Sequence, residues 1–245
     1  LAKEHGSNRV QVYVENDEQL NRRHDDLAWV GKVRAAIAED RLRLYAQRID
    51  PLDRHPARLQ YEVLVRMIDA TGQLCAPSAF LPAAERYGQA IPIDLHVLTL
   101  VLRELSRQSW HLAQLELCHV NVSGQSVVSA EFLAQVEALL DAHPEIAPKL
   151  CFELTESGLV SRDGMSVRNL EALREGGGRL ALDDFGTGYS SMDYLRRLPL
   201  DELKLDKSFV ERITLGDSDR AIVALMVRIA HTFGLEVVAE GVEDA

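Results

Sequence analysis

Short apolar runs alternate with segments of helical periodicity from about Leu42 to the end of the chain. This alternation is typical of βα units, in which each strand is followed by a helix that packs on the sheet. The predicted strands cover residues 42–49, 59–67, 115–123, 149–155, 179–184, 202–206 and 236–240. Such units over roughly 200 residues favour a (β/α) barrel, and a doubly wound open sheet is the alternative.

Three helices are predicted most clearly between these strands. Two of them cover residues 93 to about 107 and residues 130–140. The third has its apolar residues at helical spacing, on one face: Ala221, Ile222, Leu225, Met226, Ile229, Ala230 and Phe233. Asp217 or Ser218 is expected to cap the start of this third helix, and Gly234 to follow its end.

The first 40 residues differ from the rest, and the chain divides into three predicted segments. Residues 1–14 resemble the end of a preceding domain, and residues 15–40 a connecting helix with Leu27, Val30, Val33 and Ile37 on one face. Residues 41–245 form the predicted barrel. The chain begins at Leu1 without a signal-like segment, so a fragment of a longer protein is expected.

Composition limits the classes of function. The formal net charge of −11 at pH 7 argues against a surface that coats a nucleic-acid polymer. No run of about 18 apolar residues is present, so neither a membrane span nor membrane contact is expected. The three cysteines are far apart and lie in apolar runs, which indicates buried thiols in a reducing compartment. The eight histidines show no paired spacing, so a histidine-based metal site is not expected.

Side chains alternate between the two faces of a strand, and the predicted strands use this alternation consistently. One face is apolar, as in Leu180 and Leu182. The opposite face carries an oxygen ligand or a lysine near the carboxyl end of the strand. In a barrel these residues meet at the top, where active sites lie. They are Glu62, Asn121, Glu153, Asp183, Asp184, Lys204 and Glu240.

Five carboxylates cannot all be ionised in a small space with one lysine as the only compensation. Carboxylate and amide oxygens are the ligands of Mg²⁺ or Mn²⁺, so a two-ion site is predicted, with Asp183 bridging ions about 3.5–4 Å apart. Taken singly, a strand-end acid is more often solvated or a helix cap. That interpretation is kept for Glu156, and for Asp206 as a cap of the segment KSFV.

The motifs in this order resemble the EAL-type cyclic-di-GMP phosphodiesterases of bacterial signalling. They are EVL at 62–64, NVS at 121–123, ELTES at 153–157, DDFGTGYSS at 183–191, KLDKSFV at 204–210 and VAEGVE at 238–243. The resemblance covers about Leu42 to the end. It implies a modified TIM-type barrel with an antiparallel first strand. It also implies hydrolysis of cyclic-di-GMP to linear pGpG with two Mg²⁺ or Mn²⁺ ions, in a cytoplasmic homodimer.

The resemblance also implies roles for individual residues. One ion would be held by Glu62, Asn121, Glu153 and Asp183, and the second by Asp183, Asp184 and Glu240. Glu240 is in addition the expected general base, and Lys204 would assist the water or the phosphate. Substrate contacts are expected from Gln47, Leu64, Arg66 and Asp206. Glu156 would anchor the loop 185–191.

Three further expectations follow from the resemblance. The opening segment AKEHGSNRVQVY is similar to the last helix and strand of a GGDEF-type domain. Valine stands at the centre of the EVL motif, and strand parity directs Val63 away from the site. Only seven strands are predicted, so a final helix and strand are expected beyond Ala245.

A non-catalytic receptor for cyclic-di-GMP remains the alternative function, and an unrelated metal-dependent barrel enzyme is a third possibility.

Overall fold

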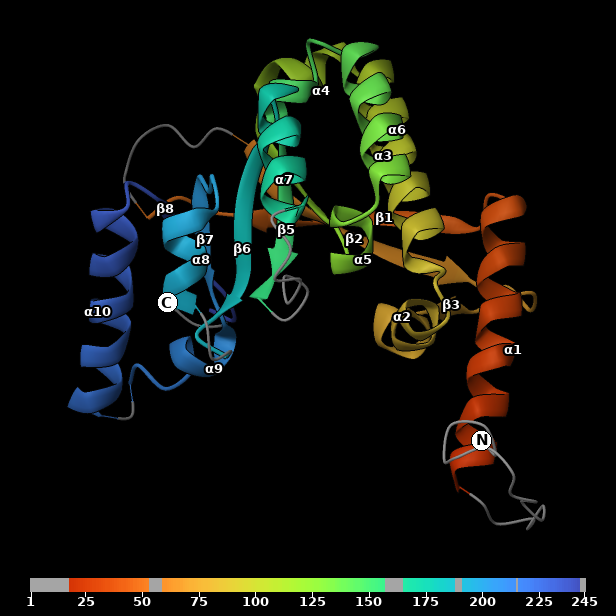
Figure 1. The fold of residues 1–245 in the computed structure, drawn as a ribbon, viewed down its shortest axis with the longest axis horizontal. Coiled ribbons are helices and arrows are strands. Elements are labelled where there is room, and N and C mark those ends of the chain that lie inside the picture. The colour runs from red at the N-terminus through yellow and green to blue at the C-terminus, as the bar shows by residue number, and fades with distance from the viewer. Residues whose placement is uncertain (1–17, 53–58, 157–164, 188–190, 215, 243–245) are drawn as a thin grey trace.

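A computed structural model describes residues 18–52, 59–156, 165–187, 191–214 and 216–242. Its centre is a single curled sheet (Figure 1). The path through the sheet is β1 (Leu42–Ile49), β2 (Leu59–Ile68), β4 (Leu115–Asn121), β5 (Leu150–Thr155), β6 (Arg179–Phe185), β7 (Glu202–Leu205) and β8 (Glu236–Ala239). β1 runs antiparallel to β2, and every later pair along this path is parallel. The predicted α/β fold and its antiparallel first strand are therefore confirmed. The sheet has the form of a half-barrel.

All seven predicted strands are present, with differences at their ends. Two strands end earlier than predicted because a residue shortly after each strand caps a helix instead. The side chain of Ser123 accepts from Ser126 N at the start of α5 (Gly124–Val127), so β4 ends before it. Asp206 likewise caps α9 (Lys207–Val210), so β7 ends at Leu205. A short strand that was not predicted, β3 (Leu74–Cys75), pairs with the end of β2.

Helices cover the outer face of the sheet and enclose the core (Figure 1). They are α1 (Glu18–Ala38), α2 (Pro77–Arg86), α3 (Ala90–Arg107), α4 (Ser109–Gln114), α6 (Ala130–Asp141), α7 (Met165–Glu175), α8 (Ser191–Arg197) and α10 (Asp217–Thr232), with a 3₁₀ turn, η1 (Ala147–Lys149). The apolar strand face packs against them through residues such as Phe152, Leu180 and Leu203, each at most 1% exposed. Burying each such side chain contributes about 1.5–3 kcal/mol.

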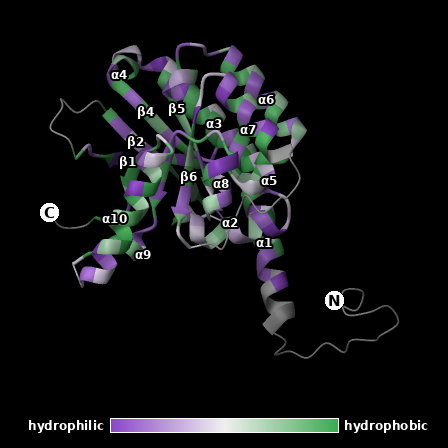
Figure 2. Ribbon diagram, turned by 60° about the vertical axis from the view of Figure 1, so that its left-hand side comes forward, coloured by the Kyte–Doolittle hydropathy of each residue, from purple (hydrophilic) through white to green (hydrophobic). Residues whose placement is uncertain are grey.

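The predicted apolar faces of two helices are only partly buried. In α1, Val30 and Val33 are buried, whereas Leu27 is 52% exposed. In α10, Val223 and Ala230 are buried, but Ile222 and Leu225 of the predicted face are exposed. Apolar residues lie on two adjacent stripes of α10, and the contacts with β7, β8 and α9 select one of them. The ribbon of α10 carries both hydrophobic and hydrophilic residues along its length (Figure 2).

The ends of α10 give one wrong and one confirmed prediction. The N-cap residue is Gly216, without a side-chain cap, so neither Asp217 nor Ser218 caps the helix. Gly234 follows the helix with φ +74°, a conformation that glycine adopts without a steric cost. In the described part of the chain, no helix is both long and apolar enough for a membrane span. Residues 1–14 and the predicted continuation past Ala245 lie outside the described residues.

Candidate functional site

The predicted ligand residues meet at the carboxyl ends of the strands, around the ammonium group of Lys204. Lys204 lies on β7 and is 1% exposed. Its Nζ lies close to four carboxylates that come from four other parts of the sheet: Glu240 Oε1 at 2.8 Å, Glu153 Oε2 at 2.9 Å, Glu62 Oε2 at 3.1 Å and Asp183 Oδ1 at 3.4 Å. Lys204 is therefore the hub of the cluster, and the convergence predicted from strand parity is confirmed.

The charge of this lysine follows from its surroundings. Burial alone would lower the pKa of Lys204, but the charges of Glu153, Asp183 and Glu62 outweigh burial and raise the pKa above its usual range. The ammonium therefore stays charged throughout the neutral range. Lys204 compensates only one of the negative charges that face it.

The amide of Asn121 joins the cluster from the end of β4. Its Nδ2 donates a hydrogen bond to Glu62 Oε1 at 2.7 Å. The amide oxygen of Asn121 takes no part in this hydrogen bond. Glu62 therefore has one oxygen on Asn121 and the other on Lys204. Both contacts hold the carboxylate of Glu62 at the mouth of the half-barrel.

The two adjacent aspartates occupy an irregularity at the end of β6. In a regular strand, neighbouring side chains point to opposite faces. Here the pairing with β7 shifts between Leu182 and Phe185, and Asp184 has φ +56°. Aspartate tolerates this left-handed conformation better than most residues. As a result, carboxylate oxygens of Asp183, Asp184 and Glu240 lie within 4.8 Å of one another.

Burial disfavours ionisation of several of these acids. It raises the pKa of Glu153 to about 9; the charge of Lys204 opposes this shift, and the charges of Glu62 and Asp183 add to it. Burial, followed by the charge of Asp183, also raises the pKa values of Asp184 and Glu240. The cluster thus has more negative charge than Lys204 can balance. An oxygen-only donor set of carboxylates and an amide fits Mg²⁺ or Mn²⁺.

Glycine positions the last of these acids. Gly241 follows Glu240 and has φ +72°, and a Cβ atom at this position would lie 2.6 Å from Lys207 Cβ. The close approach of Gly241 to α9 leaves no room for a side chain. The backbone is thereby turned immediately after Glu240, whose amide nitrogen donates to Leu205 O at 3.2 Å.

Three of the four predicted substrate contacts lie along the first two strands. Gln47 pairs with Glu62 across the β1–β2 register. Leu64 and Arg66 follow on the same face as Glu62, and Arg66 is displaced by about 13 Å along the strand. The guanidinium of Arg66 lies over the Tyr45 ring, 5.6 Å from its centroid. Val63 is 6% exposed and belongs to the hydrophobic core, so its predicted direction away from the site is confirmed.

Two further predicted residues have structural surroundings. The carboxylate of Asp206 accepts from Ser208 N at 3.0 Å and caps α9, as the sequence indicated. Glu156 follows β5 and is 3% exposed. The loop that it was predicted to anchor includes residues 188–190, which lie outside the described residues. Anchoring by Glu156 and substrate contact by Asp206 both stay predictions.

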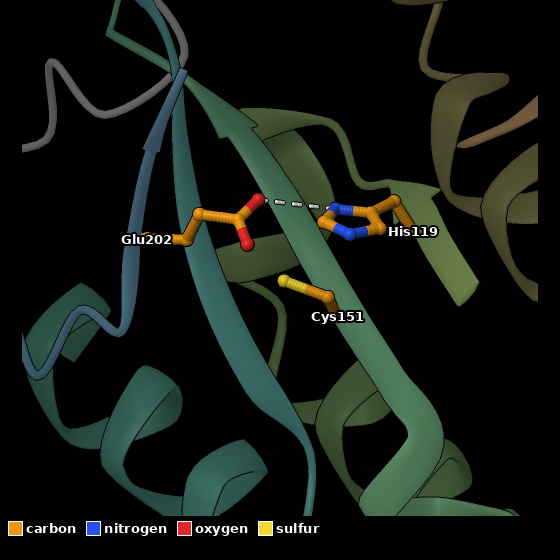
Figure 3. Close-up of side chains that lie close together, drawn as sticks. All are labelled: His119, Cys151 and Glu202. Atoms are coloured by element: carbon orange, nitrogen blue, oxygen red, sulfur yellow. Dashed lines mark ion pairs between the residues drawn. The ribbon is translucent and has the colours of Figure 1, made fainter. Parts of the chain in front are cut away.

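A second polar group, deeper in the sheet, was not predicted as a site. His119, Cys151 and Glu202 bring ligand atoms within 4.8 Å of one another (Figure 3). His119 and Glu202 each lie two residues from a member of the Lys204 cluster and so share its face, but no paired spacing along the chain marks them as metal ligands. Cys118 and Cys151 are buried thiols as predicted, whereas Cys75 is partly exposed.

The comparison with known families agrees with this geometry. The model of the EAL domain matches residues 30–245. The chain belongs to the EAL domain family. Its EAL domain therefore accounts for the whole sheet and for every residue of the Lys204 cluster.

Similar proteins carry names that specify an activity. The chain is 34% identical to "Cyclic di-GMP phosphodiesterase PdeB" of Shewanella oneidensis, over 99% of this chain and 28% of PdeB. It is 37% identical to "Cyclic di-GMP phosphodiesterase NbdA" of Pseudomonas aeruginosa, over 97% of this chain and 30% of NbdA. The chain thus spans less than a third of these relatives.

A solved structure shows the same fold. The PaMucR phosphodiesterase, in complex with c-di-GMP, superposes with a TM-score of 0.79 at 32% identity. The match covers 89% of this chain and 87% of the PaMucR chain. The EAL domain described here is therefore a modified TIM-type barrel in its architecture.

Proposed function

We propose that this EAL domain hydrolyses one phosphodiester bond of cyclic-di-GMP and releases linear pGpG, with two divalent cations, Mg²⁺ or Mn²⁺. The observation that carries the proposal is the complete set of five carboxylates and one amide around Lys204. The names of PdeB and NbdA, and the ligand of the PaMucR complex, support the choice of substrate. The activity of the longer protein is part of this proposal.

The residues would divide between two cation positions. Glu62, Asn121, Glu153 and Asp183 would hold one ion, and Asp183, Asp184 and Glu240 the other. When bound, the ions would supply positive charge opposite the phosphate oxygens and lower the pKa of the attacking water. Asp183 would be shared, because it contacts Lys204 beside Glu153 and also belongs to the group with Asp184 and Glu240.

Lys204 and Glu240 would act together in proton transfer. The ammonium of Lys204 lies 2.8 Å from Glu240 Oε1 and favours the ionised form of that carboxylate. An ionised Glu240 can accept a proton from the attacking water at its carboxylate. Glu240 keeps 26% of its side chain exposed, so a substrate can reach it.

The remaining predicted residues would bind the substrate. Gln47, Leu64 and Arg66 extend from Glu62 along β1 and β2, and Arg66 can offer a planar cation to a phosphate. Asp206, at the start of α9, would contact the substrate from the other side. Glu156 would brace the loop 185–191, whose first residues follow the aspartate pair.

The proposal extends to the setting of the domain. We infer a cytoplasmic location, which the unpaired thiols of Cys118 and Cys151 support, because disulfides are rare in that compartment. A homodimer and a GGDEF-type domain ending near residue 14 rest on the family resemblance. Light scattering at several concentrations tests the dimer, and a mass equal to one chain at all of them contradicts it.

One experiment separates hydrolysis from the alternative of a non-catalytic receptor. The protein is incubated with cyclic-di-GMP and Mg²⁺, and the products are separated by chromatography. Formation of pGpG in Mg²⁺, and none in excess chelator, supports the enzyme. Binding of cyclic-di-GMP without any pGpG supports the receptor and contradicts the proposed activity. None of the six oxygen ligands is replaced in this chain, which favours the enzyme.

A further inference from the structure

A second layer of polar side chains lies inside the sheet, beneath the Lys204 cluster. His119 on β4 is in register with Cys151 on β5, and Glu202 on β7 is in register with Ala181 on β6. Each ligand lies two residues before a member of the upper cluster on its own strand: Asn121, Glu153 and Lys204 respectively. Figure 3 shows the three side chains pointing toward one another from three different strands.

These side chains are buried and incompletely satisfied. His119 and Cys151 are 0% exposed and Glu202 is 1% exposed. Within the described residues, neither ring nitrogen of His119 nor Oε1 of Glu202 has a hydrogen-bond partner. Buried polar atoms in native proteins are almost always bonded, so each exception points to a partner that completes the site.

The distances fit a metal ion. His119 Nδ1 lies 3.4 Å from Glu202 Oε1. Two ligands at about 2.0–2.1 Å from a tetrahedral ion are separated by about this distance. The Sγ atom of Cys151, one ring nitrogen of His119 and one carboxylate oxygen of Glu202 lie within 4.8 Å of one another. Ala181, the register partner of Glu202 on β6, has only a methyl side chain.

The chemistry of the donors indicates which ion. Imidazole, thiolate and carboxylate together suit Zn²⁺, whereas the oxygen-only upper cluster suits Mg²⁺ or Mn²⁺. A coordinated thiol is deprotonated. A dication with one thiolate, one carboxylate and a neutral imidazole has no net charge, which is the condition for a charged group to be tolerated in a core.

We propose that His119, Cys151 and Glu202 form a buried structural site for a Zn²⁺-class cation, separate from the catalytic cluster. The ion would join β4, β5 and β7 and so hold the curl of the half-barrel. It would also fix the ring of His119, whose Nδ1 lies 3.0 Å from Glu153 Oε1. None of its three ligands belongs to the upper cluster, and His119 contacts that cluster through Glu153.

Cobalt tests this proposal, because a cysteine thiolate bound to Co²⁺ gives a charge-transfer absorption in the near ultraviolet. The chain is produced in medium supplemented with Co²⁺ and purified with Mg²⁺ in every buffer to fill the upper cluster. We expect one cobalt per chain with the thiolate absorption. Oxygen ligands cannot produce this absorption, so cobalt in the upper cluster does not imitate it.

Variants assign the absorption to one sulfur atom. The double variant Cys75→Ser/Cys118→Ser retains only Cys151 and should keep the full absorption. Cys151→Ser should lose it, and Glu202→Gln should retain at least tenfold less cobalt after dialysis against chelator. Circular dichroism confirms that each variant is folded. Absence of the absorption from the wild type or from the double variant overturns the proposal, even if Cys151→Ser does not fold. The His119–Glu202 contact would then be a metal-free polar pair.

Discussion

The ammonium of Lys204, on β7, lies 2.8 Å from Oε1 of Glu240, which directly follows the neighbouring strand β8 and is 36 positions away in the chain. Lys204 also contacts Glu62, Glu153 and Asp183. A buried cation at the centre of an acidic cluster has two consequences. It lowers the cost of burying the acids before any metal binds, and it favours the ionised form of the proposed base.

Replacing Asp183 with asparagine should largely remove binding of Mn²⁺. Asp183 is the proposed shared ligand, so its loss weakens both cation positions. Calorimetric titration of the wild type should show binding that falls at least tenfold in Asp183→Asn. Asp193→Asn is the matched control, because Asp193 lies on the surface of α8, away from the Lys204 cluster, and pairs with Arg197. Equal binding by Asp183→Asn and the wild type would show that the two-ion model is wrong.

Glu240→Gln should reduce turnover by about 10²–10⁴-fold, the usual contribution of a general base. The amide keeps the size of the side chain but cannot accept the proton. The rate of pGpG formation measures the effect, and binding of cyclic-di-GMP to the variant shows that the site is intact. A variant rate within a few-fold of the wild type contradicts the assignment of Glu240.

Lys204→Met should reduce the stability of the metal-free protein by about 3–5 kcal/mol, because four buried or partly buried carboxylates lose their shared cation. Mg²⁺ should restore more stability to this variant than to the wild type, since the ion supplies the missing positive charge. Thermal unfolding with Mg²⁺ and with chelator measures both effects. Equal stabilisation of the two proteins by Mg²⁺ would argue against cation binding beside Lys204.

Stability in chelator should fall as the pH rises from about 4.5 to about 9. The pKa of Glu153 is 4.5 when unfolded and about 9 when folded, mainly because of burial. Between these values the folded state holds a proton that the unfolded state has lost, so raising the pH favours unfolding. The slope from this one group is at most about 1.4 kcal/mol per pH unit. Denaturant titrations across this range should show a shallower slope in Glu153→Gln, and an unchanged slope would contradict the shift.

Gly241→Ala should cost more stability and activity than Gly72→Ala. Both glycines have positive φ, but a Cβ at Gly72 meets nothing within 4 Å, whereas one at Gly241 would lie 2.6 Å from Lys207 Cβ. Gly72→Ala therefore measures the backbone cost alone, about 1 kcal/mol. The additional loss in Gly241→Ala should appear in pGpG formation, because the displaced backbone adjoins Glu240. Equal effects in the two variants would show that the contact with Lys207 is not important.

The sequence by itself determined the seven strands along the path of the sheet, and which face most of their side chains share. Apolar and polar residues alternate with a period of two along each strand. The inward positions of Glu62, Asn121, Glu153 and Lys204 therefore follow from the local pattern alone. The resemblance of the motifs then indicated the family. The central valine of the first motif and the cap formed by Asp206 were also predictable, because both depend on neighbours in the chain.

The tertiary structure decided the features that depend on contacts between distant strands. The register shift between β6 and β7 and the left-handed φ of Asp184 bring two adjacent aspartates to one site, against the regular alternation. The contacts of α10 with β7 and β8 decide which of its apolar stripes is buried. His119, Cys151 and Glu202 meet only because β4, β5 and β7 curl around a common interior. A side chain's direction is set by its own backbone, but its neighbours across the sheet are set by strand pairing and curvature, which no local pattern encodes.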